Sequence, residues 1–258
     1  MILKILGCGT STGVPIPGCD CAVCSSPDPK NHRNRTSALI KLDSGDNILI
    51  DASTDLRQQA LRWNVRRINA MLLTHAHADH ILGMDDLRCF NFTLRAPIPC
   101  YGLADSLQDV RRVFSYVFDP DPNYEGGMLP QITLNPIEAY RPITILGTEI
   151  LPFELRHGRM TVLGFRCGNI AYATDCKTIP ERSITALKGV RFLVLDGLRY
   201  EQHRTHLTID EAIEIAGKIG AEKTYLTHMT HSVDYSETMA KLPPHVELAY
   251  DGLEIPGT

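Results

Sequence analysis

The segment Thr74-His75-Ala76-His77-Ala78-Asp79-His80 constrains this chain more than any other feature. It holds three imidazoles and one carboxylate, and the apolar run Ile68–Leu73 before it predicts a buried strand. The histidines therefore lie on a loop that leaves a strand end, where a rigid scaffold presents functional side chains. Imidazole nitrogens and carboxylate oxygens are good ligands for Zn, Mn or Fe. The alternative, a solvated histidine-rich loop that binds nothing, does not account for this density of ligands.

The composition is that of an ordinary globular protein. Of 258 residues, 43% are hydrophobic and 22% charged, which favours one domain over residues 1–258. The net charge of −4 gives no basic field for nucleic acid, and no apolar run is long enough to span a membrane. Met1–Leu6 is too short for the apolar part of a secretion signal and reads as a first strand. We therefore expect a cytoplasmic protein with neither a membrane nor a nucleic-acid partner.

Short apolar runs alternate with amphipathic stretches along most of the chain, which predicts mixed sheets covered by helices. Strands are expected at Ala38–Lys41, Asn47–Ile50, Ala70–Leu73, Pro99–Tyr101, Thr148–Leu155, Val162–Arg166, Asn169–Ala173, Phe192–Leu195, Lys223–Leu226 and Val246–Ala249. Helices are expected at Thr54–Trp63, Asp105–Val117, Pro180–Leu187, Ile209–Gly217 and Ser236–Leu242. A hairpin is expected over Ile143–Leu155 around Gly147, and two prolines and a glycine pair make Phe118–Gly127 an exposed excursion.

Further candidate ligands follow other predicted strands. His157, Asp175 and His228 each come directly after an apolar run, and Asp51 ends the run Asn47–Ile50. Any one of them alone is more often a cap or a surface residue. Their order after the histidine loop is what makes them candidates for one shared site.

The histidine loop, with these residues behind it, resembles the metallo-β-lactamase superfamily over nearly the whole chain. The resemblance implies an αββα sandwich of the α/β (α+β) class, in which two mixed sheets are flanked by helices, with a dinuclear site at one sheet edge. It also implies two divalent ions, Zn or Mn, a metal-bridging hydroxide as the attacking group, and Asp79 as a catalytic residue. By this pattern one ion takes His75, His77 and His157, the other takes Asp79, His80 and His228, and Asp175 bridges them. Asp51 resembles the aspartate that orients a ligand histidine through its other ring nitrogen.

Three of the eight cysteines form a second cluster. Cys19, Cys21 and Cys24 lie on a loop flanked by glycine and proline, one ligand short of a closed tetrahedral zinc site. We expect His231, three residues after His228, to complete it. Closed thiolate sites are structural, whereas histidine–carboxylate sites keep an open position, so this cluster predicts a structural zinc. Free or redox-active thiols, or a disulfide, are the alternatives. The other cysteines, expected mostly in the core, are Cys8, Cys89, Cys100, Cys167 and Cys176.

The combination of this thiolate triplet with the histidine loop and the closing His228-x-x-His231 is similar to the PhnP family of phosphodiesterases. The opening loop Gly7–Pro15 and the final segment Tyr250–Ile255 also resemble the corresponding segments of that family. This resemblance implies hydrolysis of cyclic phosphodiesters such as 5-phosphoribosyl 1,2-cyclic phosphate, a small phosphorylated partner, and a possible homodimer.

His206 matches the family histidine that serves as general acid, and the reaction needs one because an alkoxide leaving group must be protonated. Thr208 or Asp210 is expected to cap the helix that follows. On the same stretch, Arg199 and Arg204 are candidates to hold a second phosphate through their guanidinium groups, although either one alone is more often a surface charge.

Three other functions fit some of these features. A tRNA 3′-processing endonuclease shares the metal motifs but needs a protruding basic or glycine-rich arm; the chain has no basic run, and the acidic stretch Asp119–Glu125 would repel a phosphate backbone. The excursion near residues 116–135 is longer than in the PhnP pattern and is a candidate to cap the site. A thioester or lactone hydrolase uses the same ligands, but such members commonly lack the thiolate cluster. A noncatalytic metal-dependent binding module would be expected to have lost some of the ligands.

Overall fold

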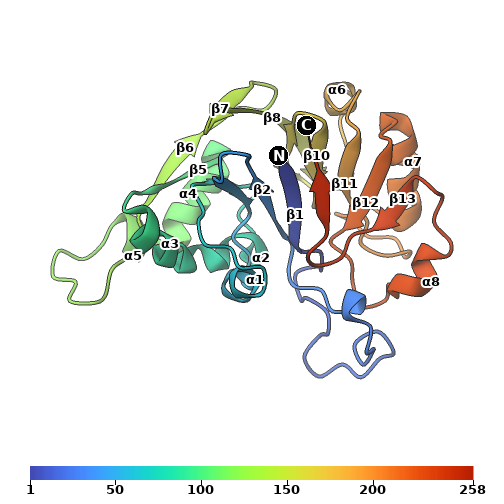
Figure 1. The fold of residues 1–258 in the computed structure, drawn as a ribbon, viewed down its shortest axis with the longest axis horizontal. Coiled ribbons are helices and arrows are strands. Elements are labelled where there is room, and N and C mark those ends of the chain that lie inside the picture. Colours follow the sequence, from blue (N-terminus) through green and yellow to red (C-terminus); the bar gives the residue numbers. More distant parts are fainter. Residues whose placement is uncertain (258) are drawn as a thin grey trace.

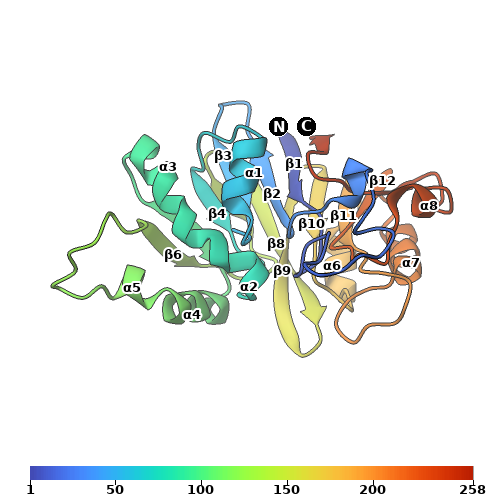
Figure 2. The same ribbon diagram turned by 90° about the horizontal axis from the view of Figure 1, so that it is seen from below.

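The computed structural model describes residues 1–257 and contains two seven-stranded β-sheets packed face to face (Figures 1 and 2). In spatial order the first sheet contains β14 (Glu254–Pro256), β1 (Ile2–Gly7), β2 (Ser37–Lys41), β3 (Asn47–Ile50), β4 (Ala70–Leu72), β5 (Ile98–Gly102) and β6 (Ile132–Pro136). The second contains β13 (Val246–Leu248), β12 (Lys223–Thr227), β11 (Phe192–Asp196), β10 (Ile170–Ala173), β9 (Met160–Cys167), β8 (Thr148–His157) and β7 (Ile143–Ile145).

Helices cover the outer faces of both sheets, which completes the predicted αββα sandwich (Figure 1). The first sheet carries α1 (Leu56–Arg62), α2 (Ala78–Ile81), α3 (Leu87–Leu94), α4 (Ala104–Val113) and α5 (Ser115–Phe118). The second carries α6 (Glu181–Ala186), α7 (Ile209–Ile219) and α8 (Tyr235–Met239). Two short 3-10 helices are η1 (Pro29–Asn31) and η2 (Leu82–Asp86). Within residues 1–257 no helix has the length and apolar character needed to cross a membrane.

The central strands are apolar on both faces because each sheet is covered on both sides. In β3, Ile48 and Ile50 pack into the core between the two sheets, whereas Leu49 packs into the core beneath the helices of the first sheet. Side chains alternate along a strand, so consecutive apolar residues supply two separate cores. A continuous apolar run in the sequence is therefore what this sandwich requires.

Strands β3 to β6 run parallel, as do β10 to β13. Ligands and substrates commonly bind outside the carboxyl ends of parallel strands, because the loops that follow such strands meet there. The chain ends lie together on the first sheet, where β14 pairs with β1 (Figure 1).

The predicted strands all occur, with ends that differ by one or two residues. The exceptions concern other elements. The helix expected over Asp105–Val117 is wrong as one element, because the backbone breaks at buried Phe114 and gives α4 and α5. The strands β6 and β14 and the helices α2 and α3 were not predicted; Asp79 and His80, expected on a loop, lie in α2. Four of the five remaining cysteines are buried as expected, and Cys89 is exposed.

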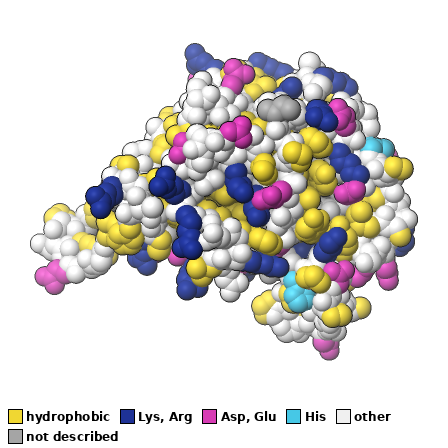
Figure 3. All heavy atoms as spheres, viewed as in Figure 1, with side chains coloured by type: hydrophobic (Ala, Val, Ile, Leu, Met, Phe, Trp, Pro, Cys, Tyr) yellow, Lys and Arg dark blue, Asp and Glu magenta, His cyan; other side chains and the backbone are white. Residues whose placement is uncertain are grey.

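The excursion after α5 is exposed and irregular over residues 119–128, as predicted, but its end forms the edge strand β6. Both ribbon views show this loop projecting from the far end of the first sheet, away from α2 (Figures 1 and 2). Figure 3 shows hydrophobic and acidic side chains on this projection, where Tyr124 and Met128 are exposed. The expectation that it caps the site of its own chain is therefore wrong.

Candidate metal centre

The candidate ligands come from strand ends on both sheets, and three of the residues that follow a strand have an unusual backbone. Asp51, Asp175 and His228 have φ values of 59°, 56° and 63°. This left-handed region is costly for a residue with a Cβ atom, and such strain concentrates at functional sites. The sequence gives no sign of it.

Three histidine side chains form the first ligand group. His75 Nε2 lies 2.9 Å from His77 Nδ1, and the ligand atoms of His75, His77 and His157 all lie within 4.8 Å of one another. His157 directs its Nδ1 to the carbonyl oxygen of Thr205 at 2.9 Å, which leaves Nε2 for the group. Nitrogen atoms at these separations can bind one cation.

The second group consists of Asp79, His80 and His228, with Asp175 between the two groups. His80 Nε2 lies 3.3 Å from Asp79 Oδ2 and 3.4 Å from Asp175 Oδ2. The other Asp175 oxygen, Oδ1, lies 3.2 Å from His228 Nε2 and 3.9 Å from His75 Nε2. Asp175 is thus in contact with both groups, as a bridging carboxylate would be.

The residues fit a pair of divalent ions. The Nε2 atoms of His80 and His228 are buried and make no hydrogen bond among the described residues, although carboxylates surround them. Burial favours the neutral form of His228, but the neighbouring Asp175 and Asp79 outweigh it and raise its pKa to about 9. Bound cations would satisfy these nitrogen atoms in place of protons.

Asp51 occupies the position predicted for it behind a ligand histidine. Its Oδ2 lies 2.7 Å from His80 Nδ1, and it accepts hydrogen bonds from the backbone N–H and the hydroxyl of Thr74 at 2.9 and 2.8 Å. Both residues are fully buried. This bond fixes which nitrogen of His80 faces the ligand cluster.

His206 lies directly beside the ligand cluster. Its ring stacks on His228 at 4.7 Å and lies 4.6 Å from the ring of His157, and it is only 7% exposed. Nδ1 is 2.8 Å from Asp196 Oδ2, and that oxygen also accepts a hydrogen bond from the Cys176 backbone N–H at 2.7 Å. The arrangement leaves His206 Nε2 available to exchange a proton with a substrate.

Asp196 is a site residue that was not predicted from the sequence. It ends β11, and its carboxylate is fully buried, which is costly unless a partner satisfies it. The available signal was an acidic residue that closes an otherwise apolar strand, Phe192–Asp196. Thr208, in contrast, caps α7 as expected, in a capping box with Glu211.

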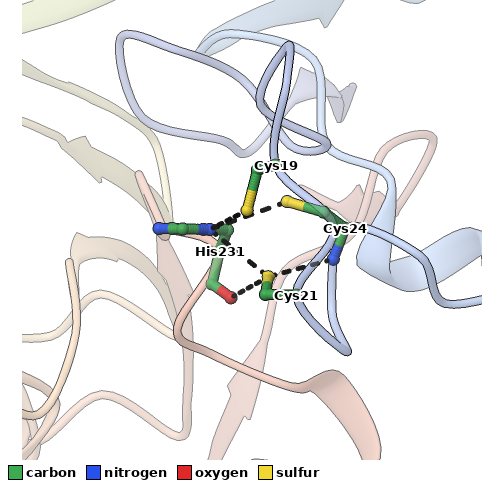
Figure 4. A group of neighbouring side chains, drawn as sticks. All are labelled: Cys19, Cys21, Cys24 and His231. Carbon is green, nitrogen blue, oxygen red and sulfur yellow. Dashed lines mark hydrogen bonds between the residues drawn. The ribbon is translucent and has the colours of Figure 1, made fainter.

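The thiolate cluster brings together the four residues expected there (Figure 4). The Sγ atoms of Cys19, Cys21 and Cys24 lie 3.3, 3.4 and 3.6 Å from His231 Nδ1. In a tetrahedral site with Zn–S of about 2.3 Å and Zn–N of about 2.0–2.1 Å, sulfur and nitrogen would be about 3.5 Å apart. A hydrogen bond from the Cys24 backbone N–H lowers the pKa of Cys21 to about 6, whereas burial raises the pKa of Cys24 to about 11, so a metal would have to displace the Cys24 proton. The residues therefore fit a zinc ion.

A buried arginine holds the turn that lies between the two ligand clusters. The guanidinium of Arg33 donates to the carbonyl oxygens of Thr230 and Val233 at 3.0 and 2.7 Å, and to Asn31 Oδ1 at 3.0 Å. It is 1% exposed. These contacts hold the turn that carries His231 and immediately follows His228.

A groove of about 560 Å³ opens beside His206. Its walls come from the opening loop and from the loops that follow β11 and β12. They consist of Thr10, Ser11, Thr12, Ile16, Leu198, Arg199, Glu201, His203, His206, Thr230, His231 and Ser232. The groove thus runs from the histidine–carboxylate cluster toward the thiolate cluster.

Comparison with known proteins agrees with this geometry. The beta-lactamase superfamily domain matches residues 46–229. A solved structure described as a new diphosphatase from the PhnP family is 40% identical, with a TM-score of 0.91, and the match covers 98% of this chain and 96% of that one.

Two curated proteins match less completely. One named octanoyltransferase, from Porphyromonas gingivalis, is 41% identical over 97% of this chain and 50% of its own length, so this chain spans about half of it. Ribonuclease Z of Treponema pallidum is 30% identical over 53% of this chain and 39% of its own length. The superfamily match extends over most of the chain, and the PhnP-family structure is matched over nearly its whole length as well, which the octanoyltransferase is not. This chain belongs to the PhnP family of metallo-β-lactamase-fold hydrolases.

Proposed function

We propose that this chain is a metal-dependent phosphodiesterase that opens cyclic phosphodiesters such as 5-phosphoribosyl 1,2-cyclic phosphate. Residues 1–258 would act as a single hydrolase domain with two Zn or Mn ions in the histidine–carboxylate cluster and a structural zinc in the thiolate cluster. The kinship with a PhnP-family diphosphatase supports chemistry at phosphorus.

The observation that carries the proposal is the pairing of His206 with Asp196 beside the ligand cluster. His206 packs against His228 and His157, and its Nδ1 contacts Asp196. In the proposed reaction a water molecule loses one proton to the solvent, its oxygen bonds to phosphorus, and the bond from phosphorus to one ester oxygen breaks. His206 Nε2 donates a proton to that departing oxygen, and Asp196 holds the ring in position and stabilises its charged form.

The metal ligands would serve the same reaction at the attacking water. A dinuclear centre, when bound, lowers the pKa of water and stabilises charge on the attacking and departing oxygens. Asp175 would hold the separation of the two ions, and Asp51 fixes the orientation of His80.

Hydrolysis of a diphosphate bond is the second candidate, because a solved relative that is 40% identical is described as a diphosphatase. A departing phosphate needs a proton less than an alkoxide does, so the His206–Asp196 pair favours the phosphodiester.

A substrate panel tests the proposal. Protein reconstituted with Zn or Mn should hydrolyse bis(p-nitrophenyl) phosphate and ribosyl or 2′,3′-nucleoside cyclic phosphates, and should be slower by a factor of about 100 or more on an octanoyl thioester, a lactone and a tRNA precursor. The thioester belongs in the panel because one relative is named octanoyltransferase. Preference for a diphosphate, a thioester or tRNA would replace the proposal by that activity. Inertness toward the whole panel would favour a binding module.

A further inference from the structure

The loop that projects from the first sheet carries only negative charge. Residues 118–136 contain no Lys, Arg or His, and their charged members are Asp119, Asp121 and Glu125. Only Asp119 forms an ion pair within residues 1–257, so two of these charges are unpaired. Every residue from 119 to 128 is exposed, and the Tyr124 side chain is among them at 48%. Unpaired charge beside an exposed aromatic ring on one projecting loop is typical of a surface that another protein covers.

A surface of opposite charge lies on α1 and on the turn that follows it. Residues 56–67 contain no Asp or Glu but four arginines, which are Arg57, Arg62, Arg66 and Arg67. All four are exposed, and among the described residues none of them forms an ion pair. The Cζ atom of Arg62 lies 4.9 Å from the centre of the Trp63 ring, a contact that leaves its charge in place. A chain with a net charge of −4 thus carries a local basic patch.

Part of this basic patch lines a second groove, which we call the α1 groove. It has a volume of about 490 Å³ and lies between α1 and the opening loop, where Arg57, Arg62 and the buried Arg33 line it. Nε of Arg33 is buried and has no hydrogen-bond partner among the described residues. Leu61 also lines the groove and, at 67%, is the most exposed large apolar side chain in residues 1–257. A cationic groove with an exposed leucine suits an acidic segment that carries a large apolar side chain.

The loop and the α1 groove lie at the two ends of one face of the first sheet. At one end α1 contacts η2, and η2 contacts α3. At the other end Asn91 of α3 bonds to the backbone N–H and carbonyl oxygen of Gln131 at 2.9 and 3.1 Å, where the loop returns to β6. Between the two surfaces α3 exposes Phe92, at 62%. Figures 1 and 2 show the loop pointing away from α1, so it does not reach the groove of its own chain.

We propose that residues 119–128 of one copy bind the α1 groove of a second copy, and that the same contact made in reverse gives a two-fold homodimer. The acidic side chains then meet the arginines of the groove, and Tyr124 packs on Leu61. A two-fold axis makes every such contact twice. Exposed ion pairs contribute little to affinity, so the apolar side chains stabilise the dimer while the charges decide which surfaces meet. The family resemblance implies a homodimer, and this inference gives it an interface.

Sedimentation velocity with charge-reversal variants tests this contact. Wild type should contain a species of twice the chain mass of 28.7 kDa, and its dissociation constant should rise by about tenfold or more from about 0.05 M to about 0.5 M salt. Arg57→Glu with Arg62→Glu, or Asp121→Lys with Glu125→Lys, should each weaken the dimer by about tenfold or more, because like charges then meet. All four substitutions in one chain should restore the dimer, because the charges are again opposite.

Two exposed residues of the second half of the chain provide matched controls. Arg204 and Glu214 lie neither on the projecting loop nor on α1. Arg204→Glu and Glu214→Lys should therefore change the dissociation constant by about twofold or less. A monomer at every protein concentration would overturn the inference, as would a dimer that neither charge-reversal pair weakens. Circular dichroism and metal content should match wild type in each variant.

A photochemical cross-link locates the contact in the purified protein. With p-benzoylphenylalanine in place of Tyr124, irradiation should join two copies, and mass spectrometry should place the link within residues 57–62 of the second copy. The same replacement at Tyr200, which is 37% exposed on the loop after β11, is the control and should give no link to residues 57–62. Links from position 124 to another part of the second copy would mean that the copies meet through a different face, and would refute the inference.

Discussion

His206 gains its proposed role from its surroundings and not from the histidine alone. The Asp196 carboxylate is 2.8 Å from Nδ1 and fully buried, so the ring has one orientation and one free nitrogen. His245, in contrast, is exposed at the surface and has no such partner. A histidine can thus be a candidate proton donor or an ordinary surface residue, depending on its neighbours.

Substitution of His206 should therefore slow the enzyme according to the leaving group. His206→Ala should reduce kcat on an alkyl cyclic phosphate by a factor of about 10²–10⁴, because the alkoxide must then depart without a proton donor. On bis(p-nitrophenyl) phosphate the loss should be about tenfold or less. Asp196→Asn should show the same pattern with a smaller loss, and His245→Ala should change neither rate. Steady-state kinetics on the two esters give the answer. An equal loss on both would remove the general-acid role.

At the level of the element, the opening loop has little besides the candidate zinc site to fix its shape. The part that carries Cys19, Cys21 and Cys24 forms neither helix nor strand, and these thiols pack only with a few neighbours in a small cluster. His231 reaches it from the other end of the chain. Since little apolar burial holds this loop, a bound zinc would supply much of its stability.

Loss of one thiolate should accordingly release one zinc and spare the catalytic pair. In Cys19→Ser we expect metal analysis after dialysis to find one zinc per chain fewer than in wild type, because a closed site needs all four ligands. Cys89→Ser is the matched control, since that cysteine is exposed and outside the cluster. If Cys19→Ser kept its full zinc content, the thiols would be free or redox-active instead.

At the scale of the whole molecule, one buried carboxylate joins the two ends of the chain. Asp251 accepts hydrogen bonds from the backbone N–H groups of Cys8 and Asn34 at 3.1 and 2.8 Å and from the Asn34 side chain at 2.9 Å. Burial outweighs these donors and raises the pKa of Asp251 to about 6. The folded chain therefore binds this proton more tightly than the unfolded chain does.

The sign of the pH dependence follows from that shift. As the pH rises from about 4 to 6, the unfolded carboxyl is already ionised while the folded one is still protonated, so stability falls through this window. A raised pKa of this size corresponds to about 3 kcal/mol in the free energy of unfolding. Urea unfolding of wild type and Asp251→Asn at matched metal content should show that decline in wild type only. Parallel curves would contradict the assignment.

Most of the fold could be predicted because each sheet is covered on both faces. Runs such as Asn47–Ile50 are apolar at consecutive positions and identify central strands. The edge strands β6 and β14 could not be found in this way, since an edge strand is half exposed and its pairing partner is remote in the sequence. The break at Phe114 likewise depends on where that ring is buried, which a helical period does not reveal.

The sequence by itself determined the metal chemistry, because histidine and carboxylate ligands crowded around strand ends have few other physical uses. Only the tertiary structure decided which polar residues are partners. It placed Asp196 behind His206, and it brought Arg199 but not Arg204 to the groove. It also showed that the acidic loop near residues 119–128 projects away from the site that it was expected to cover. The type of ligand that a side chain offers is fixed by the residue itself. The burial of that side chain and its distance to its partners are fixed only when the two sheets pack together.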